Sequence, residues 1–199
     1  MINAGDRARY GTMAFLALLV TIFFMAGTVR WWGRVIFPAK YGDLIQEQSE
    51  DHRLDPLLVL ALIREESAFD AKAVSRRGAL GLMQVMPETG AWIAAQLGEK
   101  FSAERLLAPF DNVRYGTWYL RYLFTEFDGD TIKVLAAYNA GSNRVHTWLS
   151  GGVWDGSLAQ LERMPFTETR RYVIKILRSY RIYRFLYAGG KAKLDRKRS

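Results

Sequence analysis

An uncharged and strongly apolar run lies near the start of the chain. From Tyr10 to Val29 there are 20 residues without a charged side chain, and most are Leu, Phe, Val, Ile, Met or Ala. At a rise of about 1.5 Å per residue, a helix of this length spans roughly the 30 Å hydrocarbon layer of a membrane. Residues that favour the headgroup region follow it, namely Arg30, Trp31, Trp32 and Arg34. The pattern predicts a membrane anchor over 10–29, between an N-terminal segment 1–9 and a juxtamembrane linker 30–40.

A cleaved signal peptide is the alternative interpretation of the same run. Signal peptides have a shorter apolar region and a small-x-small cleavage site, and residues 26–29 form a poor site ahead of two tryptophans. The pattern therefore favours an uncleaved anchor. Charge does not orient it, because the positive charges before and after the run balance under the positive-inside rule.

After Pro38, apolar positions recur at helical spacing in short segments separated by glycines. One helix is predicted over Leu57–Glu66, because Asp55 is a good N-cap and Pro56 suits the first helical position. Alternation of apolar and polar residues, which is typical of strands, is weak and confined to 151–154. We therefore expect one all-α domain. Its other helices are predicted at Tyr41–His52, Pro87–Leu97, Asn112–Phe127 after Asp111, Thr131–Tyr138 after Asp130, Asn143–Leu149 after Ser142, and Glu168–Tyr187 after Thr167.

The composition is that of a globular protein and excludes several classes. The 199 residues are 50% apolar and 24% charged and include no cysteine. This excludes a collagen, a low-complexity chain, a disulfide-stapled miniprotein and a thiolate metal site. The two histidines, His52 and His146, lie far from any plausible ligand cluster in the sequence, so we expect no metal and no cofactor.

The positive charge is concentrated at the C-terminus. Residues 168–199 include 11 basic and 2 acidic residues, which gives this segment a net charge of +9. The net charge of the whole chain is +8, so the remaining residues carry a net charge of −1. Basic residues interleaved with tyrosines would suit nucleic acid, but their spacing up to Arg184 is that of the solvated side of an amphipathic helix. We expect no nucleic-acid partner. The tail is a candidate to contact anionic lipid headgroups or acidic wall polymers, at about 1 kcal/mol per basic residue near a membrane.

One carboxylate is predicted to project from an apolar helix face. Three apolar side chains lie within about 60° of Glu66 on a helical wheel, namely Val59, Leu62 and Ile63. Burial there raises the pKa of a carboxyl, as a general acid near neutral pH requires. Glu65 lies roughly 100° away beside Arg64 and is expected to be partly exposed or ion-paired. The alternative is that Glu66 only binds backbone amides of 67–74, and the helix alone favours that.

Three further segments, 78–84, 136–141 and 166–172, bring polar groups beside glycines or apolar residues. Their polar residues include Gln84, Tyr138, Asn139, Glu168 and Tyr172. Each segment alone fits a structural role, such as a helix stop or a buried ring. Together with one carboxyl of raised pKa, amides and phenols are the groups of a sugar-binding cleft, because sugar hydroxyls need polar partners and aromatic rings pack on pyranose rings.

Four ordered motifs in these segments resemble those of the soluble-lytic-transglycosylase (SLT) catalytic domain. The motifs are Arg64–Phe69 with Ala73–Ser75, Gly78–Pro87, Ala137–Gly141 and Glu168–Val173. The resemblance covers roughly 41–187, which is the expected catalytic domain, and leaves 188–199 as a basic C-terminal tail. It implies a helical, goose-lysozyme-like domain that cleaves the β-1,4 bond between N-acetylmuramic acid and N-acetylglucosamine in peptidoglycan.

The resemblance also implies roles for single residues. The family's catalytic acid is the glutamate directly before serine in the first motif, which is Glu66 and not Glu65. The matching cleft residues are Ser75, Gln84, Tyr138 and Glu168, with Met83 lining the cleft and Asn139 and Tyr172 supporting it. Tyr138 and Gln84 are expected to orient the sugar, and Ser75 is expected to hold Glu66 by a hydrogen bond.

The implied reaction needs one carboxyl. Hydrolytic glycosidases normally hold two carboxyls about 5 to 9.5 Å apart, and no second motif acid clearly serves here, since Asp70 lies beyond the helix end and Glu168 lies in a distant element. The resemblance implies that Glu66 protonates the leaving glycosidic oxygen while the N-acetyl carbonyl assists at C1. Glu66 then takes the proton of the C6 hydroxyl as it attacks, which leaves a 1,6-anhydromuramic acid end.

Two other functions fit the same residues. A hydrolytic muramidase would use water as the nucleophile, and a non-catalytic peptidoglycan-binding protein would keep the aromatic cleft without needing Glu66 on an apolar face. The expected partners are peptidoglycan glycan strands and, through 10–29, the bacterial cytoplasmic membrane. Because peptidoglycan lies outside the cytoplasm, the resemblance implies a single-pass topology with residues 1–9 inside and the catalytic domain on the extracytoplasmic side.

Overall fold

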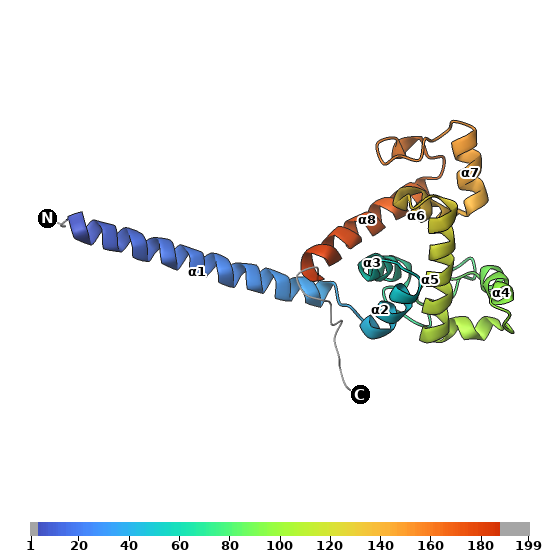
Figure 1. The fold of residues 1–199 in the computed structure, drawn as a ribbon, viewed down its shortest axis with the longest axis horizontal. Coiled ribbons are helices and arrows are strands. Elements are labelled where there is room, and N and C mark those ends of the chain that lie inside the picture. Colours follow the sequence, from blue (N-terminus) through green and yellow to red (C-terminus); the bar gives the residue numbers. More distant parts are fainter. Residues whose placement is uncertain (1–3, 188–199) are drawn as a thin grey trace. The chain divides into compact units, whose positions relative to one another are not determined.

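The structure, a computed structural model, describes residues 4–187 and divides the chain into units of residues 1–38 and 39–199. All the regular elements among the described residues are helices, with two isolated β-bridges, Val74 to Leu80 and Leu80 to Val85. The expected all-α class is confirmed. The α-helices are α1 (Ala4–Ile36), α2 (Gly42–Asp51), α3 (Pro56–Ser67), α4 (Pro87–Gln96), α5 (Pro109–Glu126), α6 (Thr131–Ala140), α7 (Ser142–Ser150) and α8 (Thr167–Tyr187), with the 3-10 helices η1 (Ala103–Leu107) and η2 (Leu161–Arg163) (Figure 1).

The first unit is built on α1, which contains the predicted anchor 10–29 and continues to Ile36, so 30–36 is helical. Residues Phe15–Ile36 are long and apolar enough to cross a membrane, and none of this stretch is buried against protein. The hydroxyl of Thr21 donates to the carbonyl of Ala17 at 2.9 Å, so this polar group is paired within the helix. Such pairing is what an apolar environment demands of a hydroxyl.

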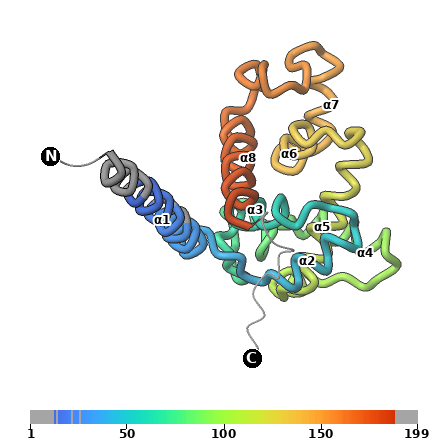
Figure 2. The backbone as a smooth tube through the Cα atoms, turned by 60° about the vertical axis from the view of Figure 1, so that its left-hand side comes forward, coloured from blue at the N-terminus to red at the C-terminus, as the bar shows by residue number. Residues whose placement is uncertain are grey.

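The central helix of the second unit is α3. Residues Leu57–Ile63 are all buried, because α2 and α8 both pack against α3 (Figure 2). A helix that is apolar all round is stable where neighbours enclose it. The predicted cap is confirmed, since Oδ1 of Asp55 accepts from the Leu57 amide at 2.8 Å ahead of Pro56. The left-handed conformation of Ala68, with φ of 50°, ends α3 and leaves Glu66 in its last turn.

The remaining helices surround this centre. α6 packs against α5, α7 and α8, and its predicted cap is confirmed, since Oδ1 of Asp130 accepts from the Ile132 amide at 2.9 Å. Ser142 does not cap α7, whose N-cap is Gly141 without a side-chain hydrogen bond. Residues 151–154, where the alternation typical of strands is weak, form no strand. This segment is a turn, in which the Val153 amide donates to the Trp148 carbonyl at 3.0 Å.

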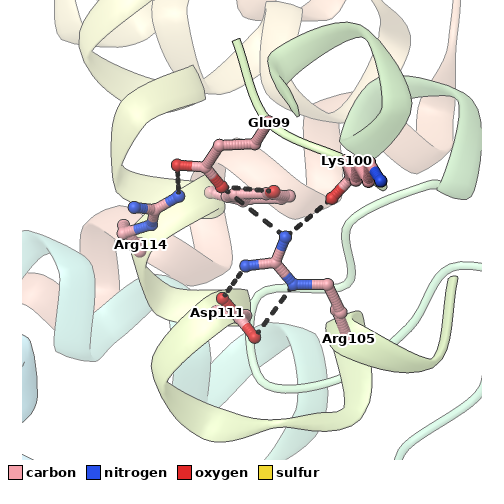
Figure 3. A network of polar contacts seen from close by, with 6 residues as sticks. Glu99, Lys100, Arg105, Asp111 and Arg114 are labelled. Atoms are coloured by element: carbon pink, nitrogen blue, oxygen red, sulfur yellow. Dashed lines mark hydrogen bonds and ion pairs between the residues drawn. The ribbon is translucent and has the colours of Figure 1, made fainter. Parts of the chain in front are cut away.

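The start of α5 differs from the prediction. The helix begins at Pro109, after Ala108, and not at Asn112 after a cap by Asp111. Proline is favoured at the first helical position because its φ is already helical. Asp111 instead accepts from Arg105 Nη2 at 2.8 Å, within a polar network that joins the segment after α4 to η1 and α5 (Figure 3).

That network contains two acids and two arginines. Glu99 accepts from the Arg114 guanidinium and, at 3.2 Å, from the Tyr115 hydroxyl. The hydrogen bond from Arg114 lowers the pKa of Glu99, so its carboxylate is the favoured form. Arg105 also donates to the Lys100 carbonyl at 2.8 Å. These contacts fix the position of η1, whose Leu106 carbonyl supports the loop described below.

Candidate active site

Glu66 combines burial with a single strong donor. Its side chain is largely buried, and burial is the main cause that raises its pKa from the ordinary 4.5 to about 7. A hydrogen bond from the Tyr172 hydroxyl to Glu66 Oε1, at 2.5 Å, opposes that rise, and the nearby charge of Glu65 adds to it. Near pH 7 this carboxyl can therefore either release or accept a proton. The sequence prediction of a raised pKa at Glu66 agrees with this geometry.

Two tyrosines accompany Glu66, Tyr138 from α6 and Tyr172 from α8. The Tyr138 hydroxyl donates to the Met83 carbonyl at 2.9 Å. The pKa of each phenol is raised well above its usual range. Burial is the largest cause, and the charge of Glu66 is the next. Both rings therefore stay protonated at neutral pH and act as hydrogen-bond donors. α3, α6 and α8 thus bring to one place three groups that are up to 106 positions apart.

The loop over residues 78–85 is held by a buried asparagine that sequence reasoning missed. Asn112 Oδ1 accepts from the Met83 amide at 2.7 Å, and its Nδ2 donates to the carbonyls of Leu80 at 2.8 Å and Leu106 at 2.7 Å. Asn112 has no exposed surface. Its only sequence signal is an amide near the start of an amphipathic helix, which does not say what the amide binds.

Gly81 and Ser67 complete the support of this loop. Gly81 has φ of +73°, and a Cβ there would overlap the Leu106 carbonyl oxygen and the Asn112 amide. The position therefore needs glycine both for its backbone conformation and for space. The Ser67 hydroxyl, next to Glu66, donates to the Leu82 carbonyl at 2.8 Å and joins the end of α3 to the loop.

Gln84 and Ser75 serve mainly to hold backbone. Gln84 has a left-handed φ of 48°, and its Nε2 donates to the carbonyls of Gly81 at 2.9 Å and Ala73 at 3.3 Å. Within residues 4–187 nothing donates to its Oε1. Ser75 Oγ accepts from the Ala79 amide at 2.9 Å. The expected hydrogen bond from Ser75 to Glu66 is not formed in the described part of the chain, because the Ser75 side chain closes its own turn.

Met83, Asn139 and Glu168 lie in three different settings. The Met83 side chain has no exposed surface and packs under Gly116, so it does not line a cleft as expected. Asn139 Oδ1 accepts from the buried Thr169 hydroxyl at 2.7 Å, which joins α6 to α8. Glu168 is an exposed acid whose Oε2 lies 3.2 Å from Arg77 Nη2.

The other acids near Glu66 in sequence are engaged elsewhere. Glu65 Oε1 accepts from the Ser179 hydroxyl of α8 at 2.5 Å. Asp70 is exposed and accepts from the Lys72 amide at 2.9 Å, within its own turn. Among the residues that the structure describes, no group of three or more His, Cys, Asp or Glu could hold a metal ion. His52 binds the Gln48 carbonyl at 2.8 Å.

Comparison with known proteins identifies the family. Residues 43–155, more than half of the chain, match the Transglycosylase SLT domain. The chain belongs to the transglycosylase SLT family. This SLT chain is 38% identical over 162 residues to the soluble lytic murein transglycosylase of Escherichia coli strain K12, a match that covers 79% of the chain and 25% of that protein. It is 32% identical over 170 residues to the membrane-bound lytic murein transglycosylase C of Edwardsiella ictaluri, over 73% of the chain and 46% of that protein.

Solved structures agree with the family. The SLT chain resembles the lytic transglycosylase Slt from Pseudomonas aeruginosa, solved as an inactive glutamate-to-glutamine mutant, with a TM-score of 0.69 and 34% identity over 76% of the chain and 25% of that one. It also resembles the 70 kDa soluble lytic transglycosylase from Escherichia coli, with a TM-score of 0.73 and 33% identity over 85% of the chain and 30% of that one. The SLT chain thus spans a quarter to just under half of the length of these relatives.

Proposed function

We propose that this protein is a membrane-anchored lytic transglycosylase that cleaves the β-1,4 bond between N-acetylmuramic acid and N-acetylglucosamine in peptidoglycan. The observation that carries the proposal is the Glu66 carboxyl, largely buried, with a pKa of about 7 and a tyrosine donor at 2.5 Å. A general acid is most effective when its pKa lies near the operating pH. The names of the relatives, which are lytic murein transglycosylases, support the substrate class.

The reaction moves one proton out of Glu66 and one back. Protonated Glu66 donates to the glycosidic oxygen as its bond to C1 of N-acetylmuramic acid breaks, and the N-acetyl carbonyl of the same sugar assists at C1. The Glu66 carboxylate, held by the Tyr172 hydroxyl, then takes the proton of the C6 hydroxyl as that oxygen bonds to C1. The products are a free 4-hydroxyl on one sugar and a 1,6-anhydro ring on the other, and no water is consumed.

The number of available acids favours this reaction over hydrolysis. A hydrolytic muramidase normally uses a second carboxyl near C1, and Glu65, Asp70 and Glu168 each have another partner in this protein. An internal nucleophile also gains from effective molarity, since it is already held beside C1. We infer that the C6 hydroxyl replaces water.

The proposed location follows from the substrate and from α1. The apolar stretch Phe15–Ile36 would cross the bacterial cytoplasmic membrane once, with 1–9 inside and the catalytic domain 41–187 outside, where peptidoglycan lies. The basic tail 188–199 lies outside the described residues. We propose that it contacts anionic lipid headgroups or acidic wall polymers.

The test is to digest purified sacculi with the full chain in detergent micelles and to measure the masses of the products by mass spectrometry before and after borohydride treatment. We expect 1,6-anhydromuramic acid ends, which are one water lighter than hydrolysed ends and resist reduction. Glu66→Gln should lower turnover by at least about 10² to 10⁴-fold, whereas Glu65→Gln, the matched control, should keep most of it. Reducible ends that carry oxygen from labelled water would establish the muramidase instead. Binding without turnover by the unmodified chain would establish a non-catalytic binding protein.

A further inference from the structure

Four aromatic rings gather on α4 and α5 beside the proposed active site. Trp92 lies with its ring centroid 5.3 Å from Trp118 and 5.0 Å from Tyr122. The ring of Tyr122 stacks on Trp118 at 6.0 Å and on Tyr119 at 6.3 Å. We call Trp92, Trp118, Tyr119 and Tyr122 the aromatic platform. It joins α4 to α5 through rings that lie 26 to 30 positions apart in the sequence.

The aromatic platform is continuous with the active site. Tyr119 lies with its centroid 5.6 Å from that of Tyr138, and the charge of Glu66 raises the pKa of Tyr138. A chain of ring contacts therefore runs from the neighbourhood of the catalytic carboxyl through Tyr138, Tyr119 and Tyr122 to Trp92. A ligand that occupied Glu66 and extended along this direction would meet aromatic faces.

The outer rings are not core residues. Trp92 is 37% exposed and Tyr122 is 40% exposed, whereas Tyr115 on the same helix α5 has no exposed surface. Leaving large apolar rings in water is unfavourable, and contiguous exposed apolar surface often belongs to a binding site. Aromatic side chains bury about 150–250 Å² each, so two partly exposed rings offer far less than the roughly 800 Å² per partner of a stable protein interface.

We propose that the aromatic platform is a distal binding site for sugar rings of the glycan strand whose bond lies at Glu66. The apolar faces of pyranose rings pack on aromatic rings, and a strand that lies along successive rings is held without any charged contact. This inference rests on the proposed function, because it takes the strand at Glu66 to be peptidoglycan. It makes the platform a determinant of glycan length preference, separate from the chemistry.

The test compares a ring-removing and a ring-keeping double variant of the full chain in detergent micelles. Trp92→Leu with Tyr122→Leu removes two rings and keeps apolar bulk, whereas Trp92→Phe with Tyr122→Phe keeps rings at both positions. Phe110→Leu changes an exposed ring of α5 that has no ring contact with the platform and is the matched control. Binding to sacculi is measured by sedimentation in a Glu66→Gln background, and kcat and KM are measured with Glu66 intact on long strands and on the shortest strand that is cleaved.

The leucine pair should bind long strands about tenfold more weakly and raise KM for them by a similar factor, which corresponds to about 1.4 kcal/mol. The kcat of the leucine pair, and its KM for the shortest strand, should stay within about twofold of the values for the unmodified chain. The phenylalanine pair and Phe110→Leu should stay within about twofold in binding, kcat and KM for all strands. Unchanged binding by the leucine pair, with Glu66→Gln still inactive, would overturn the platform and leave the proposed function intact. If the unmodified chain neither bound nor cleaved sacculi, both proposals would fail.

A second measurement does not depend on the folding of any platform variant. Long glycan strands should protect Trp92 from oxidation in the Glu66→Gln chain, as read by mass spectrometry of its peptide, while a strand too short to pass Tyr138 should not. Equal oxidation of Trp92 with and without long strands would also overturn the platform.

Discussion

The hydroxyl of Tyr172 lies 2.5 Å from Oε1 of Glu66 and donates a hydrogen bond to it. Of the causes that set the pKa of Glu66, this hydrogen bond is the one that favours the charged carboxylate. Burial and the charge of Glu65 act in the opposite direction. The pKa of about 7 is therefore a balance between a dry position on α3 and a donor on α8. A proton donor that must later accept a proton needs such a balance.

Removing this donor should shift the pH dependence of turnover. In Tyr172→Phe the carboxylate loses the bond that stabilises it, so the pKa of Glu66 should rise further above 7. The alkaline limb of kcat/KM, where Glu66 loses the proton it must donate, should move to higher pH. Tyr180→Phe removes a phenol of the same helix that donates to Asp55, and it should leave the limb in place. An alkaline limb that did not move in Tyr172→Phe would contradict the assignment of Glu66 as the acid.

The raised pKa of Glu66 should also cost stability above neutral pH. Because the pKa is raised in the folded state, the folded protein binds more protons than the unfolded chain between pH 4.5 and 7, so the free energy of unfolding falls as pH rises through this interval. The rise from 4.5 to about 7 corresponds to roughly 3 kcal/mol. Glu66→Gln should therefore be more stable than the unmodified chain at pH 8, by up to about that amount, and no more stable near pH 4.5.

Unfolding of the full chain in detergent, followed at both pH values, measures this difference. Glu168→Gln changes an exposed acid and is the control, with no expected gain at pH 8. A gain in Glu66→Gln that was equal at both pH values would indicate a packing effect and not the titration of Glu66.

Two glycines of one loop offer a matched pair of substitutions. Gly78 and Gly81 both have left-handed φ, of +85° and +73°, but a Cβ at Gly78 would meet nothing within 4 Å, while one at Gly81 would overlap Leu106 and Asn112. Gly78→Ala should cost about 1 kcal/mol for its conformation alone. Gly81→Ala should cost at least about 2 kcal/mol more, because backbone must move to admit the methyl group. Equal losses, measured by chemical unfolding, would show that the loop adapts without cost.

The apolar surface of α1 predicts how the chain partitions in cells. The full chain should sediment with membranes and resist extraction by salt or alkali, since the 22-residue stretch Phe15–Ile36 is long and apolar enough to cross a membrane and is not buried in protein. The soluble fraction should contain none of it in the absence of detergent. Soluble protein whose N-terminal sequence began after residue 29 would instead indicate a cleaved signal.

What the sequence could predict was mostly local. The caps at Asp55 and Asp130 and the apolar surroundings of Glu66 depend on residues within two turns of one helix, and the structure agrees with them. The partners of Ser75 and the burial of Met83 depend on how a loop folds back on α5, and periodicity carries no information about that.

Tertiary contacts also explain the larger omissions. Asn112 looked like the start of a helix, yet its amide binds three backbone groups in the 80–83 loop and η1. Trp92 and Tyr122 lie on different helices, and only the packing of α4 on α5 brings their rings within 5.0 Å. A single sequence gives the residue types at such places but not the distances between them.

The enclosure of α3 has a consequence for dynamics. Residues Leu57 to Ile63 are all buried in the core of the second unit, so we expect their backbone amides to be among the slowest of the chain to exchange hydrogen. Glu66 lies in the last turn of this enclosed helix and not on a flexible loop. In the proposed reaction the glycan would therefore have to come to the carboxyl, and the motions that admit and release strands would arise in segments other than the helix that carries Glu66.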